Sequence, residues 1–172
     1  WYERNNKCLR LEVSFSEVEF SDTATYERML AFYRATASVP YLEHLHLHQT
    51  DDPHKHRIRL VPVGVQRMPS SPEELKICIK QVLTCLQTLH AMGYVHCDVR
   101  WSNIISVFAE WFVIDCEYAC SLNDTALLTE RSTLIKQRHV IDLSKPWDER
   151  FDLYQVGILL DDCSFTANVP DL

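Results

Sequence analysis

Apolar and polar residues alternate along 8–20, along 41–49 and again over 57–66, a period of two that predicts β-strands. The polar segment 50–53 separates the second and third runs, so these two runs are expected to form a hairpin. One face of the first strand is predicted to be apolar and to carry Leu9, Leu11, Val13 and Phe15.

Two helices are predicted where capping residues precede apolar positions at helical spacing. The first covers 25–37 and follows a polar capping triplet. The second covers 71–93, where Ser71 and Glu74 form a capping box around a proline at the first helical position. The apolar face of this second helix is predicted to consist of Leu75, Ile79, Val82, Leu83, Leu86 and Leu89.

The second half of the chain continues with two short apolar runs, 103–107 and 111–114, which predict strands. Residues 120–148 are polar and irregular, and 151–160 predicts a final helix. Strands with one helix are thus followed by mainly helical sequence, an order that predicts an α+β fold.

Composition narrows the class of protein. The chain has 172 residues, and 47% of them are hydrophobic, a fraction that argues against disorder. Its net charge of −7 has the wrong sign for binding nucleic acid through bulk electrostatics. We therefore expect no nucleic-acid partner. We also expect no membrane span, because no apolar run approaches roughly 18 residues. Seven cysteines without a CxxC pair are typical of reduced, intracellular thiols. Since the sequence opens without Met, we expect a fragment or a processed product.

The strongest chemical signal lies in the segment 94–105, directly after the second predicted helix. Asp98 is followed five residues later by Asn103, and the next strand ends in Asp115. This order resembles the protein-kinase-like fold, in which His-x-Asp, an Asn five residues on and a strand ending in Asp form the site. The segment 152–157 resembles the helix that follows the kinase activation segment.

The resemblance implies a two-lobed α+β architecture, of which this chain would hold a part. Residues 1–66 would form a partial small lobe with an antiparallel sheet, 67–72 the hinge, and 73–172 a larger, mainly helical lobe. The first two strands of the small lobe and the last helices of the larger lobe are expected to lie outside the chain.

The resemblance also implies roles in ATP- and Mg²⁺-dependent phosphoryl transfer. Asp98 would orient the substrate hydroxyl, and Arg100 would place positive charge near the γ-phosphate. Asn103 and Asp115 would be hard oxygen ligands for Mg²⁺. Glu117 would be a further metal ligand or a solvated carboxylate.

The expected nucleotide-binding residues come from the first part of the chain. Glu27 on the first predicted helix is the candidate for an ion pair with a strand cation, either Lys7 or Arg10. A solvated Glu on an amphipathic helix is the alternative. The adenine is expected to lie against backbone groups of the hinge at Gln66, Arg67 and Met68.

Several departures from the kinase pattern leave the activity open. Cys97 stands where kinases carry the Arg of the loop motif, and Cys116 and Glu117 replace Phe-Gly after the metal-binding Asp. No glycine-rich loop precedes the site, because the first glycine is Gly64. The leading prediction is a protein Ser/Thr kinase-like phosphotransferase. The alternatives are a pseudokinase that serves as a protein-binding module and a small-molecule kinase of the aminoglycoside or choline type.

Within this superfamily, the wording of 95–105 and the strand ending at 114–117 resemble the divergent kinase-like domains of fungi and oomycetes, including those of Crinkler effectors. That resemblance implies delivery into a host cell, with the host nucleus as a destination. A second constellation consists of histidines along one strand face, which would bind zinc or simply face solvent. These histidines are His44, His46 and His48, followed by His54 and His56.

Overall fold

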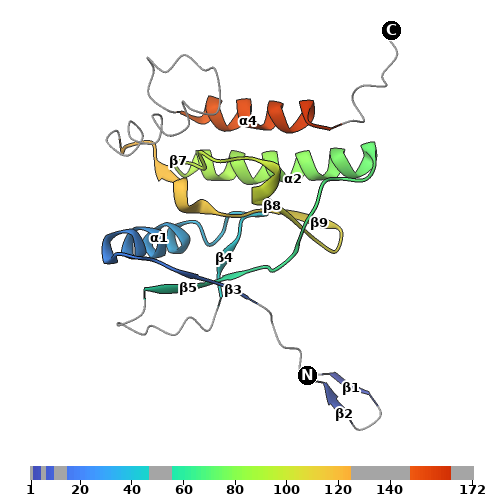
Figure 1. Cartoon of the computed structure of the whole chain (residues 1–172), viewed down its shortest axis with the longest axis horizontal. Coiled ribbons are helices and arrows are strands. Elements are labelled where there is room, and N and C mark those ends of the chain that lie inside the picture. Colours follow the sequence, from blue (N-terminus) through green and yellow to red (C-terminus); the bar gives the residue numbers. More distant parts are fainter. Residues whose placement is uncertain (1, 5–6, 10–14, 47–55, 125–147, 164–172) are drawn as a thin grey trace.

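The computed structural model describes residues 2–4, 7–9, 15–46, 56–124 and 148–163 (Figure 1). Over these residues the fold is α+β, with three α-helices and small antiparallel sheets. The helices are α1 (Thr23–Ala35), α2 (Pro72–Ala91) and α4 (Glu149–Asp161), with short 3₁₀ helices η1 (Trp101–Asn103) and η2 (Cys116–Tyr118). The strands are β1 (Tyr2–Arg4), β2 (Lys7–Leu9), β3 (Ser16–Glu19), β4 (His44–Leu45), β5 (Arg57–Val61), β6 (Val65–Gln66), β7 (Tyr94–Val95), β8 (Ile104–Val107), β9 (Glu110–Val113) and β10 (Cys120–Ser121).

The first sheet has the strand order β3-β5-β4, and all its pairs are antiparallel. The predicted hairpin between 41–49 and 57–66 is confirmed in its pairing, since Leu45 lies opposite Leu60. The single strand predicted over 8–20 is wrong, because β2 and β3 are separate strands in different sheets. Phe15, predicted on an apolar face, is exposed and lies under the guanidinium of Arg59. Leu11 and Val13 lie outside the described residues.

Helix α1 follows β3 and begins two residues earlier than predicted. The Asp22 side chain accepts a hydrogen bond from the Thr25 backbone N–H at 2.8 Å, which satisfies one of the free donors of the first turn. The buried face of α1 carries Met29, Leu30, Phe32 and Tyr33.

The second sheet has the order β6-β8-β9. Gly64 stands just before β6, where a Cβ atom would lie 2.6 Å from the backbone oxygen of Ser106, so only glycine permits this close approach. The strands β8 and β9, which the apolar runs predicted, pair with each other as a hairpin, with Trp111 fully buried. Farther along, β7 pairs with β10.

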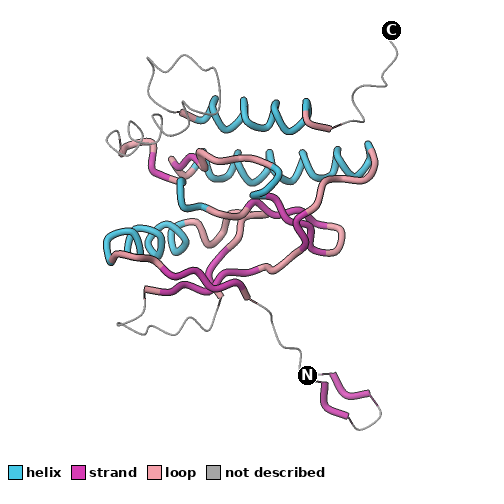
Figure 2. Tube along the Cα trace, viewed as in Figure 1, coloured by secondary structure: helices cyan, strands magenta, loops and turns pink. Residues whose placement is uncertain are grey.

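Helices α2 and α4 lie next to each other on one side of the β6-β8-β9 sheet, with α1 and the first sheet on the other (Figures 1 and 2). The predicted capping box of α2 is half formed. The Ser71 hydroxyl accepts from the Glu74 N–H at 3.2 Å, but the Glu74 carboxylate accepts from the Ser70 N–H, at 2.6 Å. Its apolar face is partly wrong: Leu83 is exposed and Ile79 only half-buried. Two cysteines take their place, and the buried face reads Leu75, Cys78, Val82, Cys85, Leu86 and Leu89.

Among the described residues, none of the helices combines the length and the apolar composition that crossing a membrane requires. The cysteines whose side chains are described are thiols, and all of them are buried, as expected for small hydrophobic side chains.

Candidate functional site

The loop between β7 and η1 is held in place by a buried carboxylate on α4. Asp152 is fully buried and accepts hydrogen bonds from the backbone N–H groups of His96 at 2.9 Å and Cys97 at 2.8 Å. His90, near the end of α2, contacts the same carboxylate through Nε2 at 2.8 Å. The Asp152 side chain therefore joins the loop to both α2 and α4.

A second side chain of α4, Gln155, bonds the same loop from one turn farther along. Its Oε1 accepts from the Val99 N–H at 2.9 Å, and its Nε2 donates to the Cys97 carbonyl at 3.1 Å. Between these contacts Cys97 has a φ of 69°, a left-handed conformation that costs a non-glycine residue about 1–2 kcal/mol. The hydrogen bonds from α4 offset that cost and define the path of the loop.

Asp98 and Asn103 contact each other directly. The Asn103 Nδ2 donates to the Asp98 carbonyl at 3.0 Å and to the Asp98 Oδ2 at 2.8 Å. Arg100 adds an ion pair, with its Nε 3.0 Å from the same Oδ2. The amide nitrogen of Asn103 is committed to Asp98, whereas its Oδ1 accepts only a long hydrogen bond, 3.5 Å, from the Ser102 hydroxyl and has a second lone pair for a cation.

His96 supports this loop from the interior, where it is fully buried. Its Nδ1 accepts from the Asp98 N–H at 3.3 Å, so the neutral ring carries its proton on Nε2. Within the described residues Nε2 meets no hydrogen-bond partner of good geometry, although the Ile114 backbone lies near enough to favour the protonated ring. Burial lowers the pKa of His96, against the opposing effect of the nearby carboxylates, chiefly Asp152.

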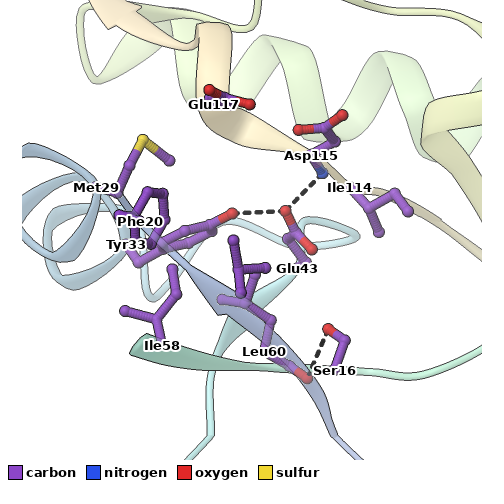
Figure 3. A pocket seen from close by; sticks show the side chains of 11 residues that line it. Ser16, Phe20, Met29, Tyr33, Glu43, Ile58, Leu60, Ile114, Asp115 and Glu117 are labelled. Carbon is purple, nitrogen blue, oxygen red and sulfur yellow. Dashed lines mark hydrogen bonds between the residues drawn. The ribbon is translucent and has the colours of Figure 1, made fainter. Parts of the chain in front are cut away.

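Asp115 lies two residues after the end of β9 and is brought beside Asn103 by the backbone of Ile114. The Ile114 N–H donates to the Asn103 carbonyl at 2.9 Å. Asp115 itself has a φ of 64°, so the chain turns sharply at this residue before η2 begins. Asp and Asn tolerate the left-handed region better than most residues. The turn leaves the carboxylates of Asp115 and Glu117 on the same side of a pocket (Figure 3).

This pocket has a volume of about 190 Å³ and lies between α1, the first sheet and the end of β9. It is mostly apolar, and its charged lining residues are all acidic. No lysine, arginine or histidine is among the described residues that line it. The lining residues are Ser16, Val18, Phe20, Met29, Tyr33, Glu43, Ile58, Leu60, Ile114, Asp115 and Glu117.

Glu43 is the most deeply buried acid of the pocket, with 5% of its surface exposed. Its Oε1 accepts from the Tyr33 hydroxyl at 2.6 Å and from the backbone N–H groups of Asp115 at 2.6 Å and Cys116 at 3.3 Å. Burial raises the pKa of Glu43, and these hydrogen bonds act in the opposite direction. The sequence analysis did not single out Glu43, because a lone acid among apolar residues and histidines carries no local signal.

A magnesium ion fits the donor set at the loop. The Asn103 oxygen and the Asp115 carboxylate are the hard oxygen atoms that Mg²⁺ prefers, and Mg²⁺ commonly takes one or two protein ligands together with substrate phosphates. In the part of the chain that the structure describes, no group of three or more His, Cys, Asp or Glu side chains is placed to hold a metal. Of the predicted histidine cluster, His48 and His54 lie outside the described residues.

Comparison with known proteins adds a relative. None of the sequence models of known protein families matches the chain. Crinkler effector protein 8 of Phytophthora infestans is 32% identical to it in an alignment 166 residues long that covers 92% of this chain. The chain is homologous to part of a Crinkler effector. It covers 27% of that Crinkler protein's length, so what the whole effector does comes to this chain only as a proposal.

The Crinkler resemblance expected from the sequence is therefore supported, and the structure brings several of the predicted site residues together. Asp98, Arg100 and Asn103 form one hydrogen-bonded group, with Asp115 joined to it through the backbone. Glu117 is exposed at the rim of the pocket.

The predicted nucleotide-binding residues lie elsewhere. Glu27 is exposed on α1 and does not line the pocket. Gln66 pairs with β8, and Arg67 bonds Glu74 and the Ser106 hydroxyl, so the side chain of Arg67 holds the start of α2. Neither they nor Met68 line the pocket beside Asp115. Of the two candidate strand cations, Arg10 lies outside the described residues, and only the backbone of Lys7 is described.

Proposed function

We propose that the chain carries the acceptor-orienting and metal-binding part of an ATP- and Mg²⁺-dependent phosphotransferase. The observation that carries the proposal is the hydrogen bond between Asp98 and Asn103. Their loop is anchored by α4 and contacts the backbone of the residue before Asp115. Phosphoryl transfer needs an oriented hydroxyl, a cation on the phosphates and fixed geometry, and these residue types supply all three.

Each residue has a distinct task in this proposal. The Asp98 carboxylate accepts a hydrogen bond from the incoming hydroxyl and orients the hydroxyl oxygen toward the transferred group. Asn103 holds Asp98 through its amide nitrogen and presents its oxygen with the Asp115 carboxylate to Mg²⁺, which when bound neutralises charge on the nucleotide phosphates. Arg100 forms an ion pair with Asp98 and so brings positive charge to the same place.

The acceptor that we favour is a Ser or Thr hydroxyl of a protein in a host cell. The support for this choice is the relationship to a protein named as an effector, together with the kinase-like order of the loop residues. A small-molecule acceptor, as in aminoglycoside or choline kinases, stays the alternative within the same chemistry.

A second candidate function is a binding module without turnover. The observation that favours it is the pocket lining, in which the described residues offer acids and apolar side chains but no cation for the phosphates. In that case Asp98 and Asn103 would serve only to shape the loop.

The experiment compares the wild type with Asp98→Asn for transfer of labelled phosphate from Mg²⁺·ATP to a generic protein acceptor. Loss of the hydroxyl-orienting carboxylate is expected to lower the rate by about 10²–10⁴. Nucleotide affinity should stay nearly unchanged, because the contact acts in the transition state. Asp161→Asn, an exposed acid at the end of α4, is the matched control.

Melting temperatures of all three proteins separate chemistry from folding. Loss of transfer at constant stability supports the phosphotransferase. A wild type that transfers no phosphate and is not stabilised by Mg²⁺·ATP would instead favour the binding module.

A further inference from the structure

Glu43 is delivered to the end of β9 by the backbone on either side of it. The Val113 N–H donates to the Tyr41 carbonyl at 2.8 Å, and the Glu43 N–H donates to the Val113 carbonyl at 2.9 Å. Leu42 between them forms an isolated parallel bridge with Val113 and is buried. The segment before β4 therefore runs alongside the last residue of β9, and the side chain of Glu43 reaches the turn that follows.

At this turn the carboxylate meets two successive backbone donors. Asp115 is left-handed and Cys116 begins the 3₁₀ helix η2, so their N–H groups point into the same small concavity. Such a concavity binds an anionic oxygen. Here the oxygen is Glu43 Oε1, and the Tyr33 hydroxyl on α1 is its third donor (Figure 3).

We propose that Glu43 is the positioning residue that holds the Asp115 turn and so directs the Asp115 carboxylate toward the metal. It would do this from the segment before β4, whereas the kinase resemblance gave Glu27 on α1 as the candidate acid, in an ion pair with a strand cation. The metal-directed part of this inference rests on the proposed phosphotransferase function. The hydrogen-bonding part does not, since it concerns the backbone of Asp115 and Cys116 alone.

The role depends on an acceptor oxygen at Glu43 and on little else. Glutamine keeps an acceptor oxygen with the same reach, whereas leucine has a similar size and none. Glu43→Gln should therefore retain the turn and Glu43→Leu should release it. Glu110→Leu, which removes an exposed acid at the start of β9, is the control for replacing a carboxylate on this part of the fold.

The first measurement is amide hydrogen exchange by NMR on the full chain without ligand. Exchange at Asp115 and Cys116 should be slow in the wild type, in Glu43→Gln and in Glu110→Leu. In Glu43→Leu it should be at least about tenfold faster, the change expected when a hydrogen bond to a charged group is lost. This result does not depend on any nucleotide or metal.

The second measurement is the affinity for Mn²⁺·ADP by calorimetry. Glu43→Leu should bind at least about tenfold more weakly than the wild type, with Glu43→Gln and Glu110→Leu close to the wild type. No binding by the wild type would count against the proposed function while leaving the exchange result to decide on the turn.

The proposal is overturned if Glu43→Leu keeps the Asp115 and Cys116 amides protected, or if it binds Mn²⁺·ADP as tightly as the wild type. Should the leucine variant fail to fold, fast exchange of these two amides in the wild type or in Glu43→Gln would overturn the proposal by itself.

Discussion

Cys97 and Asp115 both adopt a left-handed backbone without being glycine, and each is held by a buried carboxylate from a distant part of the chain. Asp152 accepts from the Cys97 N–H, and Glu43 accepts from the Asp115 N–H. Strained backbone of this kind persists only where the surroundings determine it, and it concentrates at functional sites. At the scale of single residues, the candidate site is a pair of turns, each stabilised by a buried acid that accepts hydrogen bonds from its backbone.

The first prediction concerns Asp115. Asp115→Asn should abolish the Mg²⁺-dependent part of nucleotide binding, because an amide is a weaker metal ligand than a carboxylate. The fold should persist, since Asn tolerates the left-handed backbone and its N–H can still donate to Glu43. A thermal-shift titration with ATP and Mg²⁺ measures this, as a ligand at 100 times its Kd stabilises the native state by about 2.7 kcal/mol. An undiminished shift in the variant would remove Asp115 from the metal site.

A second prediction follows from the buried imidazole of His96. Burial lowers the pKa of His96 in the folded protein, so the unfolded chain binds a proton more readily than the native one below about pH 6.5. Stability should therefore fall with pH from about 6.5 toward the lower folded value, by at most about 1.4 kcal/mol per pH unit.

Urea unfolding at a series of pH values tests this. The pH dependence should be flatter in His96→Gln than in the wild type, whereas His44→Gln, on an exposed histidine, should follow the wild type. Parallel curves for all three proteins would show that His96 titrates as it does in the unfolded chain.

At the scale of elements, α2 carries two sets of apolar side chains that meet different surroundings. Its buried face packs against β9 and α4 and includes Cys78 and Cys85, which were not among the residues predicted for that face. Leu83 and Ile79, which were predicted for it, line a groove that Leu160 of α4 also lines.

The third prediction separates these two faces. Leu86→Ala should lower the free energy of unfolding by about 2–5 kcal/mol, because Leu86 is fully buried. Leu83→Ala should cost about 1 kcal/mol or less, and Gln87→Ala should be within about 0.5 kcal/mol of the wild type. Urea midpoints provide the measurement, and equal losses at Leu83 and Leu86 would show that the packing face is assigned wrongly.

The fourth prediction concerns α4. Asp152→Ala leaves the buried N–H groups of His96 and Cys97 without their acceptor, which should cost about 2–5 kcal/mol of stability. Asp161→Ala on the same helix should cost little, since Asp161 is exposed. Denaturation by urea distinguishes the two, and a mild effect at Asp152 would mean that the loop finds other partners.

At the scale of the whole molecule, the features that could be predicted from the sequence are those formed by residues near one another in the chain. Capping residues located both α1 and α2 to within two residues, alternation located the β4-β5 pair, and short apolar runs located β8 and β9. The spacing of Asp98 and Asn103 predicted their proximity, because both lie on one short loop. These signals depend on neighbours in the sequence, and the fold leaves them intact.

Long-range contacts could not be predicted in the same way. Glu43 bonds Asp115 across 72 residues, and no local pattern distinguishes it from a solvated acid. Arg67, expected beside a nucleotide, is drawn instead to Glu74 and over the Trp111 ring. In each case the tertiary partner decided the role, and a single sequence does not contain that partner's position.

The anchoring of the loop by α4 also has a consequence for the order of synthesis. Asp98 and Asn103 leave the ribosome some fifty residues before Asp152 and Gln155, which a ribosome adds in several seconds at about 5–20 residues per second. During that interval the nascent loop lacks the acceptors for the N–H groups of His96, Cys97 and Val99. The candidate site therefore becomes complete only when translation has passed α4, and a chain arrested earlier would be born without it.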